Sequence, residues 1–517
     1  METTTTLTSL WKETVDKYPD QPFLIFRDHD TRPSDTAWTY AEFDALISRT
    51  AGRLSELGIG HGDAIHICLR NCPAFLMIWL AAARLGAWMI PVDPGSSSRD
   101  IDSQLRRTRP KLGICSYAGS GTYRAGVGNS GLGVIEVSET AADTDHGSAL
   151  LSEPVARANV SPSDRMAIMF TSGTTSEPKG VILTQANYGY IATKMAAIIG
   201  QKPQDRWYVC LPLFHGNAQY YCFLPAIASG ASVALSSRFT ASGWAADVKS
   251  LRATHASLFA APIRMIIARK PADAPALELR HVWFAQSLAE KHFSEFSKIC
   301  GIVPRQLYGM TETTAIVTAN LGPHPSPDAI GKVISGRRIR LIDPATGADA
   351  RHGEPGVICV EGVRGIDLFS EYLDNSAANN KAFPDIEEGK TWFFTGDLAK
   401  TRPDSTLQFV GRIDDVIKVS GENVSLTEVE AAIAQAPNVL EAAVLAVDDP
   451  IRDKVPVAYV VPQTKDAPPK ESELSAWAER NLVPSARPRK WTIVDSLPRT
   501  SVGKIRRFKL TEVGHHQ

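Results

Sequence analysis

Short apolar runs alternate with stretches of helical length through the N-terminal half of the chain, and this alternation restricts the fold more than any other feature. Ala64 to Leu69 and Trp88 to Val92 are typical of buried strands, and Ala74 to Leu85 between them is typical of a buried helix. Further strand candidates follow at Leu112 to Cys115, Trp207 to Leu211, Ser232 to Leu235, Ser257 to Ala260 and His281 to Phe284. Strands and helices that alternate in this way predict a mainly parallel sheet covered by helices.

The rest of the chain predicts additional, smaller units. A length of 517 residues exceeds what one hydrophobic core supports, so several domains or subdomains are expected. From Ile339 to Glu361, short strands separated by Asp-Pro and glycine-rich turns predict a small β-rich subdomain. A second helical and strand series begins near Asp415, where Ser425 and Glu428 are typical of a helix capping box. Residues 116–164 are rich in Gly, Ser and Ala, and we interpret much of this segment as loose surface chain.

Charge and cysteine content narrow the classes of partner and location. The 55 basic and 56 acidic residues nearly cancel, which argues against nucleic acid or an anionic membrane as a partner and favours small molecules. Seven dispersed cysteines without a CxxC pair indicate a reducing compartment and no structural metal. The N-terminus has no signal-peptide pattern, and the longest apolar run, Ala74 to Ala83, is too short to span a bilayer. We therefore expect a cytoplasmic protein that is not integral to a membrane.

The stretch from Phe170 to Val181 has the composition of a phosphate-binding loop. It holds five hydroxyl side chains, two glycines and one lysine, and it follows the apolar run Met166 to Phe170. Hydroxyls and backbone N–H groups can surround phosphoryl oxygens, glycine permits close approach, and lysine adds a positive charge. It is not a Walker loop, because Pro178 precedes Lys179 and Gly180 follows it. The alternative is an ordinary Ser/Thr/Gly-rich surface turn.

Four further segments occur in an order and spacing that are similar to a known family. They are Tyr308 to Glu312, Phe394 to Asp397, Gly411 to Lys418, and Leu497 to Ile505. Together with the hydroxyl-rich loop, they resemble the adenylate-forming (ANL) superfamily of acyl-CoA synthetases, adenylation domains and firefly luciferase. The resemblance covers nearly the whole chain and is nearest to the carnitine-CoA or medium-chain acyl-CoA ligases.

The resemblance implies the fold class and the reaction. The implied fold is multi-domain α/β: a large N-terminal AMP-binding domain of α/β subdomains plus the small β-rich subdomain, over residues 1–411, and a mobile α+β C-terminal domain over residues 415–517. Residues 412–414 form the implied hinge, with Asp414 as the hinge residue. The implied enzyme is an AMP-forming acid–thiol ligase that converts a carboxylic acid, ATP and CoA into acyl-CoA, AMP and pyrophosphate through an acyl-adenylate. Domain alternation would present different groups to the two half-reactions.

The resemblance also assigns roles to individual residues. Lys504 would bridge the carboxylate and α-phosphate, Glu312 would hold Mg2+, and His215 and Thr171 complete the implied catalytic set. Outside this family context, Lys504 would be read as an ordinary solvated lysine. The implied ATP- or AMP-binding residues are Thr171, Ser172, Gly173, Thr174, Thr175, Lys179, Ala285, Gln286, Ser287, Tyr308, Gly309, Met310, Thr311, Asp397 and Arg412.

The acid and thiol sides follow from the same resemblance. The implied CoA-binding residues are Ser420, Gly421, Glu422 and Asn423, for which simple turn chemistry is the alternative. The implied acyl pocket contains His215, Tyr220, Ala260, Phe284 and Met310, although His215 could instead be a core or surface histidine. No Asp lies near His215 to pair with an α-ammonium group, so amino acids are disfavoured and a bulky acid of secondary metabolism is expected.

Two departures from the family pattern leave alternatives open. Ser176 stands where most members have glycine, and Phe284 to Leu288 stands where many have Gly-Gly-Ala-Pro-Leu. A ligase impaired in adenylation, which mainly performs thioesterification of a preformed acyl-adenylate, is one alternative. An adenylation enzyme that loads a carrier-protein thiol and a sensor that keeps the fold without turnover are two others. A homodimer is also kept open.

Overall fold

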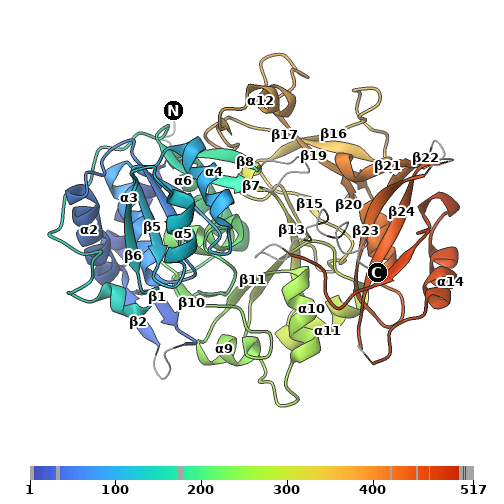
Figure 1. The fold of residues 1–517 in the computed structure, drawn as a ribbon, viewed down its shortest axis with the longest axis horizontal. Helices are drawn as coiled ribbons and strands as arrows, with labels where there is room; N and C mark the ends of the chain where they lie inside the picture. The colour runs from blue at the N-terminus through green and yellow to red at the C-terminus, as the bar shows by residue number, and fades with distance from the viewer. Residues whose placement is uncertain are drawn as a thin grey trace.

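A computed structural model of the chain describes residues 5–30, 35–171, 178–419, 422–449, 452–464 and 466–499, together with residues 505, 507 and 510. The fold class predicted from the sequence is confirmed: a large mixed α/β N-terminal part carries a small antiparallel subdomain and is followed by a C-terminal domain (Figure 1). Among the described residues, no helix is both long and apolar enough to cross a membrane.

The first large sheet carries the phosphate-loop hairpin. Its strand order is β18-β8-β7-β4-β3-β5-β6, with parallel pairing from β7 to β6 and antiparallel pairing of β8 with both neighbours. The strands are β3 (Ala64–Cys68), β4 (Trp88–Pro91), β5 (Leu112–Ser116), β6 (Gly133–Val137), β7 (Arg165–Thr171), β8 (Lys179–Thr184) and β18 (Glu371–Tyr372).

The second large sheet has nine strands in the order β15-β14-β13-β12-β11-β9-β10-β1-β2. Its centre, from β13 to β1, is parallel. The strands are β1 (Pro22–Arg27), β2 (Thr36–Thr39), β9 (Arg206–Val209), β10 (Ser232–Ser236), β11 (His255–Phe259), β12 (His281–Ala285), β13 (Arg305–Tyr308), β14 (Thr318–Ala319) and β15 (Lys332–Val333).

Two smaller sheets follow in the chain. The predicted β-rich subdomain is an antiparallel sheet of β16 (Arg338–Ile342), β17 (Gly356–Glu361), β19 (Trp392–Thr401) and β20 (Leu407–Arg412). The C-terminal sheet contains β21 (Val416–Val419), β22 (Glu422–Ser425), β23 (Val439–Asp449), β24 (Asp453–Pro462) and β25 (Trp491–Ile493).

The helices cover these sheets and connect their strands. The longer helices are α1 (Leu7–Lys17), α2 (Tyr40–Glu56), α3 (Pro73–Leu85), α4 (Ser98–Thr108), α5 (Ser120–Val127), α6 (Gln185–Ile199), α10 (Ala260–Arg269), α11 (Glu290–Cys300), α13 (Leu426–Ile433) and α14 (Glu471–Asn481). The shorter ones are α7 (Gly216–Ala218), α8 (Leu224–Ser229), α9 (Trp244–Ser250), α12 (Ser376–Ala382), the π-helical turn η2 (Gln219–Phe223), and the 3-10 turns η1 (Ala141–Thr144), η3 (Thr311–Thr313), η4 (Ile413–Asp415) and η5 (Pro484–Ala486).

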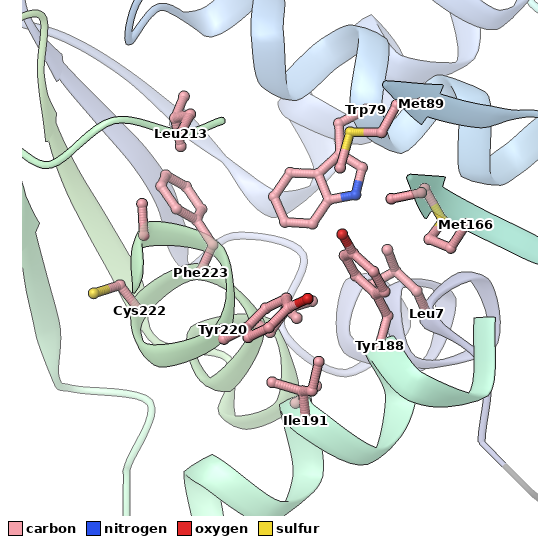
Figure 2. Packing of buried hydrophobic residues seen from close by; sticks show 14 of the residues in the cluster. Leu7, Trp79, Met89, Met166, Tyr188, Ile191, Leu213, Tyr220, Cys222 and Phe223 are labelled. Atoms are coloured by element: carbon pink, nitrogen blue, oxygen red, sulfur yellow. The ribbon is translucent and has the colours of Figure 1, made fainter. Parts of the chain in front are cut away.

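Helix α3 lies at the centre of the main core because it is apolar on every side. Pro73 begins the helix and Gly86 ends it in the left-handed conformation, an arrangement that favours sharp boundaries. The Trp79 ring lies 5.9 Å from the ring of Tyr188 on α6, and Phe223 packs on the other side of Trp79 (Figure 2). An all-apolar helix of this kind is stable only when other elements bury it, so it fixes α6 and η2 beside it.

The expectation of loose surface chain over residues 116–164 is wrong for its first part. Helix α5 and strand β6 form there, and β6 extends the first large sheet by pairing in parallel with β5. Gly126 of α5 lies so close to α4 that an added Cβ would stand 2.7 Å from Ile101. The small residues therefore serve close helix packing rather than disorder.

Candidate active site

The base of the predicted phosphate loop is the hairpin of β7 and β8. Thr171 and Lys179 are cross-strand partners, and the Thr171 hydroxyl donates to the Lys179 carbonyl at 3.5 Å. Hairpin pairing therefore holds both ends of the loop together. The predicted binding residues within the loop, Ser172, Gly173, Thr174 and Thr175, and also Ser176, lie outside the described residues.

Arg107 of α4 fixes the two strands at this base, although nothing in the sequence singled it out. Its guanidinium donates to the Pro178 carbonyl at 2.7 Å and lies 5.0 Å from the centre of the Phe170 ring. Phe170 precedes the loop and Pro178 follows it, so one side chain contacts both sides of the loop. Arg107 therefore joins Phe170 and Pro178, the described residues on either side of the loop.

Glu312, the predicted metal ligand, is buried in η3 immediately after β13. Its exposed fraction is 4%. The Tyr372 hydroxyl donates to its Oε1 atom at 3.1 Å, and the Phe369 N–H donates to its backbone carbonyl at 2.9 Å. Burial, followed by the nearby Glu312 carboxylate, holds the pKa of Tyr372 far above its usual range. Tyr372 is therefore a neutral hydrogen-bond donor at physiological pH.

Lys179 reaches the same tyrosine from the other side. Its Nζ atom lies 4.9 Å from the centre of the Tyr372 ring, a distance that suits a cation–π contact. Tyr372 thus touches a predicted phosphate-binding cation and the predicted metal ligand. Sequence patterns do not reveal Tyr372, because a two-residue strand such as β18 has no periodicity to detect.

Asp397 and Arg412 face each other across β19 and β20. They are cross-strand partners, with Arg412 Nη1 at 3.2 Å from Asp397 Oδ1, and the Tyr308 hydroxyl donates to Asp397 Oδ2 at 2.8 Å. Burial lowers the pKa of Arg412, but the carboxylates of Asp397 and Glu312 outweigh it, and the pKa ends above its usual value. Asp397 is 7% exposed, and the side chains of Tyr308 and Arg412 hold its carboxylate in place.

Gly396 permits this arrangement. Its φ of +75° lies in the left-handed region, and an added Cβ would stand 3.3 Å from Nη2 of Arg412. A side chain here would strain the backbone and crowd the guanidinium. Backbone conformation and the nearby Arg412 side chain thus explain why residue 396 is glycine.

Arg337 supports the turn that carries Glu312, and it was also missed by sequence reasoning. Its buried side chain donates to the carbonyl of Thr313 in η3 and, at 2.7 Å, to the carbonyl of Asp367. The carboxylate of Asp367 lies 3.3 Å from the same guanidinium. Arg337 therefore connects η3 to the chain that leads to β18.

The remaining nucleotide candidates lie on three neighbouring segments. Gly309, Met310 and Thr311 join β13 to Glu312, and an added Cβ on Gly309 would stand 3.2 Å from the Tyr221 hydroxyl. Ala285 ends β12 and is half-buried, whereas Gln286 and Ser287 are exposed. Gln286 has a φ of +73°, and its carbonyl accepts from Gln306 Nε2 at 3.3 Å.

Two acyl-pocket candidates lie at a helix interrupted by the π-helical turn η2. His215 occupies the N-cap position of α7 and is half-buried, with its ring 4.9 Å from that of Phe214. Tyr220 is buried among Tyr188, Ile191 and Phe223 (Figure 2), and its hydroxyl lies 3.4 Å from the Met169 sulfur. Burial raises the pKa of Tyr220, and Tyr188, Tyr221 and Glu312 add to the shift. Tyr220 belongs to the π-helical turn η2, and such turns are frequent at functional sites.

Phe284 and Ala260 lie in a different environment from that expected of pocket residues. The Phe284 ring is 1% exposed and 5.9 Å from the ring of Phe293 on α11. Ala260 begins α10 and belongs to the same apolar cluster. Val282 and Phe284 face this cluster, whereas Trp283 and Ala285 face the main core. The Phe284 ring thus packs against α11, and its role in the acyl pocket stays a prediction.

The hinge and thiol-side candidates are only partly described. Asp414 lies exposed in η4, and Glu422 lies exposed on β22. The backbone of Asn423 pairs with Lys418 of β21. Ser420, Gly421 and Lys504 lie outside the described residues.

These site residues form two groups of contacts, and the charge of one group acts on the other. Lys179 touches Tyr372, Tyr372 touches Glu312, and the charge of Glu312 acts on Arg412, which pairs with Asp397. Two cations and two carboxylates held this way can neutralise phosphates, accept from ribose hydroxyls and supply an oxygen ligand to a hard metal ion. A nucleoside triphosphate with a divalent cation matches this set of groups.

Comparison with solved structures supports the fold. The chain is similar to an anthranilate CoA ligase in complex with anthranoyl-AMP, with a TM-score of 0.88 and 21% identity over 99% of this chain and 98% of the other. A benzoate CoA ligase from Burkholderia xenovorans LB400 gives a TM-score of 0.85 and 22% identity over 98% of this chain and 99% of the other. At these identities the likeness shows the fold alone.

Comparison of sequences shows the family. The crotonobetaine/carnitine–CoA ligase of Salmonella paratyphi A (strain ATCC 9150 / SARB42) is 29% identical over 511 residues, which cover 96% of this chain and 97% of that relative. The AMP-binding enzyme family matches residues 11–373, and the AMP-binding enzyme C-terminal domain matches residues 428–504. The chain therefore belongs to the AMP-binding enzyme family, and the enzyme class predicted from its sequence, an AMP-forming acid–thiol ligase, is confirmed.

Proposed function

We propose that this chain is an acyl-CoA ligase that joins a carboxylic acid without an α-ammonium group to CoA, through an acyl-adenylate formed from ATP. The observation that carries the proposal is that Lys179 and Glu312 both contact Tyr372, while the ion pair of Arg412 and Asp397 lies close enough for the charge of Glu312 to act on Arg412. A carboxylate is already ionised at neutral pH, so the first half-reaction needs no strong base. It needs repelling anions to be neutralised and held in line, which suits this set of charges.

The nucleotide roles follow from the positions of these side chains. Asp397, oriented by Tyr308 and Arg412, would accept from the ribose hydroxyls. Lys179, at the base of the β7–β8 hairpin, would contact the phosphates together with Thr171. The turn from Gly309 to Thr311 and the segment from Ala285 to Ser287 would flank the base and the α-phosphate.

Mg2+ fits the chemistry of Glu312. A single buried carboxylate is a suitable ligand, because Mg2+ is commonly bound by one or two carboxylates plus substrate phosphates. When bound, the ion would neutralise phosphate charge as it moves to the leaving pyrophosphate. The protein's own contribution is to hold that carboxylate in place, through the Tyr372 hydroxyl on its side chain and the Phe369 N–H on its backbone.

The acid would bind on the side of η2. His215, Tyr220 and Met310 are the pocket residues we retain, because Tyr220 lies within the field of Glu312 and Met310 precedes η3. One relative is a crotonobetaine/carnitine–CoA ligase, and two structural neighbours are anthranilate and benzoate CoA ligases. We therefore propose that the acid is an aromatic, branched or medium-chain carboxylate, and that panels of these classes should be tested first.

The second half-reaction would use the C-terminal domain. We propose that residues 1–411 and 415–517 act as the two domains, that residues 412–414 act as the hinge, and that Lys504 serves adenylation. The segment from Ser420 to Asn423 would then line the path of CoA. A cytoplasmic location is proposed from the dispersed cysteines, all seven of which are unpaired and buried.

A product analysis tests the proposal directly. The protein is incubated with ATP, Mg2+, CoA and each acid, and the nucleotides and thioesters are separated by chromatography. We expect one acid class to give AMP, pyrophosphate and acyl-CoA in equal amounts, and hydroxylamine to trap the acyl group when CoA is omitted. Formation of ADP and phosphate, or AMP release that no acid stimulates, would overturn it. A carrier-protein thiol that outcompetes CoA would favour the carrier-loading alternative.

A further inference from the structure

Tyr372 lies between the two charged groups that serve the phosphates and the metal ion. Its hydroxyl donates to Glu312 Oε1 at 3.1 Å, and the Lys179 ammonium lies 4.9 Å from the centre of its ring. A phenol offers two different surfaces: a donor at its tip and an electron-rich face. Tyr372 uses the first on the carboxylate and the second on the ammonium, so each charge has a neutral partner on the same side chain.

The protein fixes Tyr372 from several directions. Strand β18 places it opposite Val181 of β8, and the N–H of the next residue, Leu373, donates to the Gly180 carbonyl at 2.8 Å. The Asn379 side chain binds the backbone of Tyr372 on both sides, accepting from its N–H at 2.7 Å and donating to its carbonyl at 3.1 Å. The side chain is buried, with an exposed fraction of 5%.

The aromatic neighbours of Tyr372 complete this support. Phe369 lies 4.7 Å from the Tyr372 ring and itself packs against Phe383 and Phe393. The N–H of Phe369 also holds the backbone of Glu312. Tyr372 and Glu312 are therefore attached to the same short segment, and neither can move without disturbing the other.

We propose that Tyr372 is a positioning residue that orients Glu312 toward the metal ion through its hydroxyl and orients Lys179 toward the phosphates through its ring. The inference rests on the proposed function, because it takes ATP and a divalent cation as the ligands of this site. The hydroxyl fixes one carboxylate oxygen and thereby sets the direction of the other. The ring binds the Lys179 ammonium weakly enough for phosphate oxygens to replace it as the partner. A carboxylate in the same place would compete with the phosphates for the ammonium.

Two substitutions separate the two effects. Tyr372→Phe removes the hydroxyl and keeps the ring, whereas Tyr372→Leu removes both. Calorimetry on the full-length protein gives the affinity for ATP with Mg2+ and with a chelator, without any acid. Mg2+ should raise the ATP affinity of the wild-type protein, and in Tyr372→Phe we expect this increase to be at least fivefold smaller. The affinity of Tyr372→Phe for ATP without metal should stay within twofold of the wild-type value. For Tyr372→Leu we expect metal-free affinity to fall at least threefold as well.

The dependence on Glu312 and Lys179 is tested by combining variants. In a Glu312→Gln background, Tyr372→Phe should lower the Mg2+ gain by less than twofold, because its target carboxylate is gone. In a Lys179→Gln background, Tyr372→Leu and Tyr372→Phe should bind metal-free ATP equally. Tyr123→Phe is the matched control: Tyr123 is also buried, and its hydroxyl lies 2.9 Å from a ring nitrogen of His66, away from this site. It should leave both affinities unchanged.

The outcomes that overturn the proposal are distinct. The proposal is overturned if Mg2+ raises the ATP affinity of Tyr372→Phe as much as that of the wild type. It is also overturned if Tyr372→Phe loses the same factor of ATP affinity with and without Mg2+, because that result would mean general damage to the site. A wild-type protein that binds no ATP overturns the proposed function, and this inference with it. If Tyr372→Leu does not fold, the Tyr372→Phe comparison and its Glu312→Gln background still decide the hydroxyl's role.

Discussion

Arg264 on α10 and Glu441 on β23 form an ion pair, with 3.7 Å between Arg264 Nη2 and Glu441 Oε2, and so join the N-terminal part to the C-terminal domain. Arg499, from the segment that leads to Lys504, pairs with the same carboxylate oxygen. Burial lowers the pKa of Arg264 to about 10 and that of Arg499 to about 10. One carboxylate thus holds two arginines that would repel each other without it.

Glu441→Gln should therefore loosen the contact between the domains. We expect acid-dependent ATP–pyrophosphate exchange to fall several-fold, because Arg499 is no longer joined through Glu441 to Arg264 of α10. CoA transfer from a supplied acyl-adenylate should be unchanged or faster. Asp448→Asn, on an exposed position of the same strand, is the control and should change neither rate. An equal fall in both half-reactions would contradict this prediction.

Asp397→Asn should weaken recognition of the ribose. The carboxylate is oriented by Tyr308 and Arg412, and an amide cannot satisfy both donors while accepting from ribose. We expect the KM for ATP to rise roughly tenfold, in line with the loss of a charge-assisted hydrogen bond. The preference for ATP over its deoxyribose analogues should shrink in the variant. Asp404→Asn, in the exposed turn of the same hairpin, should behave like the wild type.

Gly396→Ala should impair ATP binding beyond its effect on stability. The left-handed φ alone costs about 1 kcal/mol for a residue with a Cβ. Gly389→Ala is a matched control, because its φ is +72° and a Cβ there would meet nothing within 4 Å. Both variants should lose similar stability in urea unfolding. Only Gly396→Ala should raise the KM for ATP, because its Cβ displaces Arg412. Equal KM values in Gly396→Ala and Gly389→Ala would show that the space between residue 396 and Arg412 does not matter for ATP binding.

Acid should destabilise the fold through two buried histidines. Burial lowers the pKa of His66 to about 4 and that of His255 to about 4. In the unfolded chain each titrates near 6.5, so between these values the unfolded state binds more protons. Stability is therefore full above pH 6.5 and is lost as the pH falls toward 4, by about 2 kcal/mol per histidine at pH 5.

Urea unfolding between pH 7.5 and pH 5 measures this loss. His255→Gln should reduce the slope of stability against pH, since the amide cannot be protonated in this range. His352→Gln, at an exposed position, should leave the slope unchanged. The same slope in all three proteins would show that other groups control the acid response.

Phe284→Ala should behave as a core substitution. The ring is buried against Phe293, so its removal should cost about 3–5 kcal/mol of unfolding free energy. The preference among acids should stay the same. A changed acid preference with little loss of stability would instead restore Phe284 to the acyl pocket.

Much of the fold could be predicted from periodicity. The runs at Ala64 to Leu69 and Ala74 to Leu85 match β3 and α3 closely, because long apolar runs leave few alternatives. The segment that became α5 and β6 was misjudged, since small residues reduce the apolar signal while permitting close packing. Two-residue strands such as β18 carry no periodic signal at all.

The site was predictable only where its chemistry lies in motifs. Motifs name Glu312, Asp397 and Arg412, and the structure pairs Arg412 with Asp397 and brings Arg412 within the influence of the Glu312 charge. Tyr372 was missed, because its partner Glu312 is 60 residues away and its own segment carries no motif. For Phe284 the sequence leaves the direction of the side chain open. Successive side chains of a strand point to opposite faces, and only the register of β12 tells which face Phe284 occupies.

The π-helical turn η2 offers a way to change the orientation of Tyr220 by changing chain length, which a substitution cannot do. Such a turn contains one residue more than an α-helical turn, between α7 and α8. Deleting one residue there would restore a regular helix and rotate Tyr220 relative to Glu312, while the flanking helices keep their own hydrogen bonds. Chain length at this one point could thus diversify acid selectivity during evolution, or in a laboratory library, without rebuilding the core.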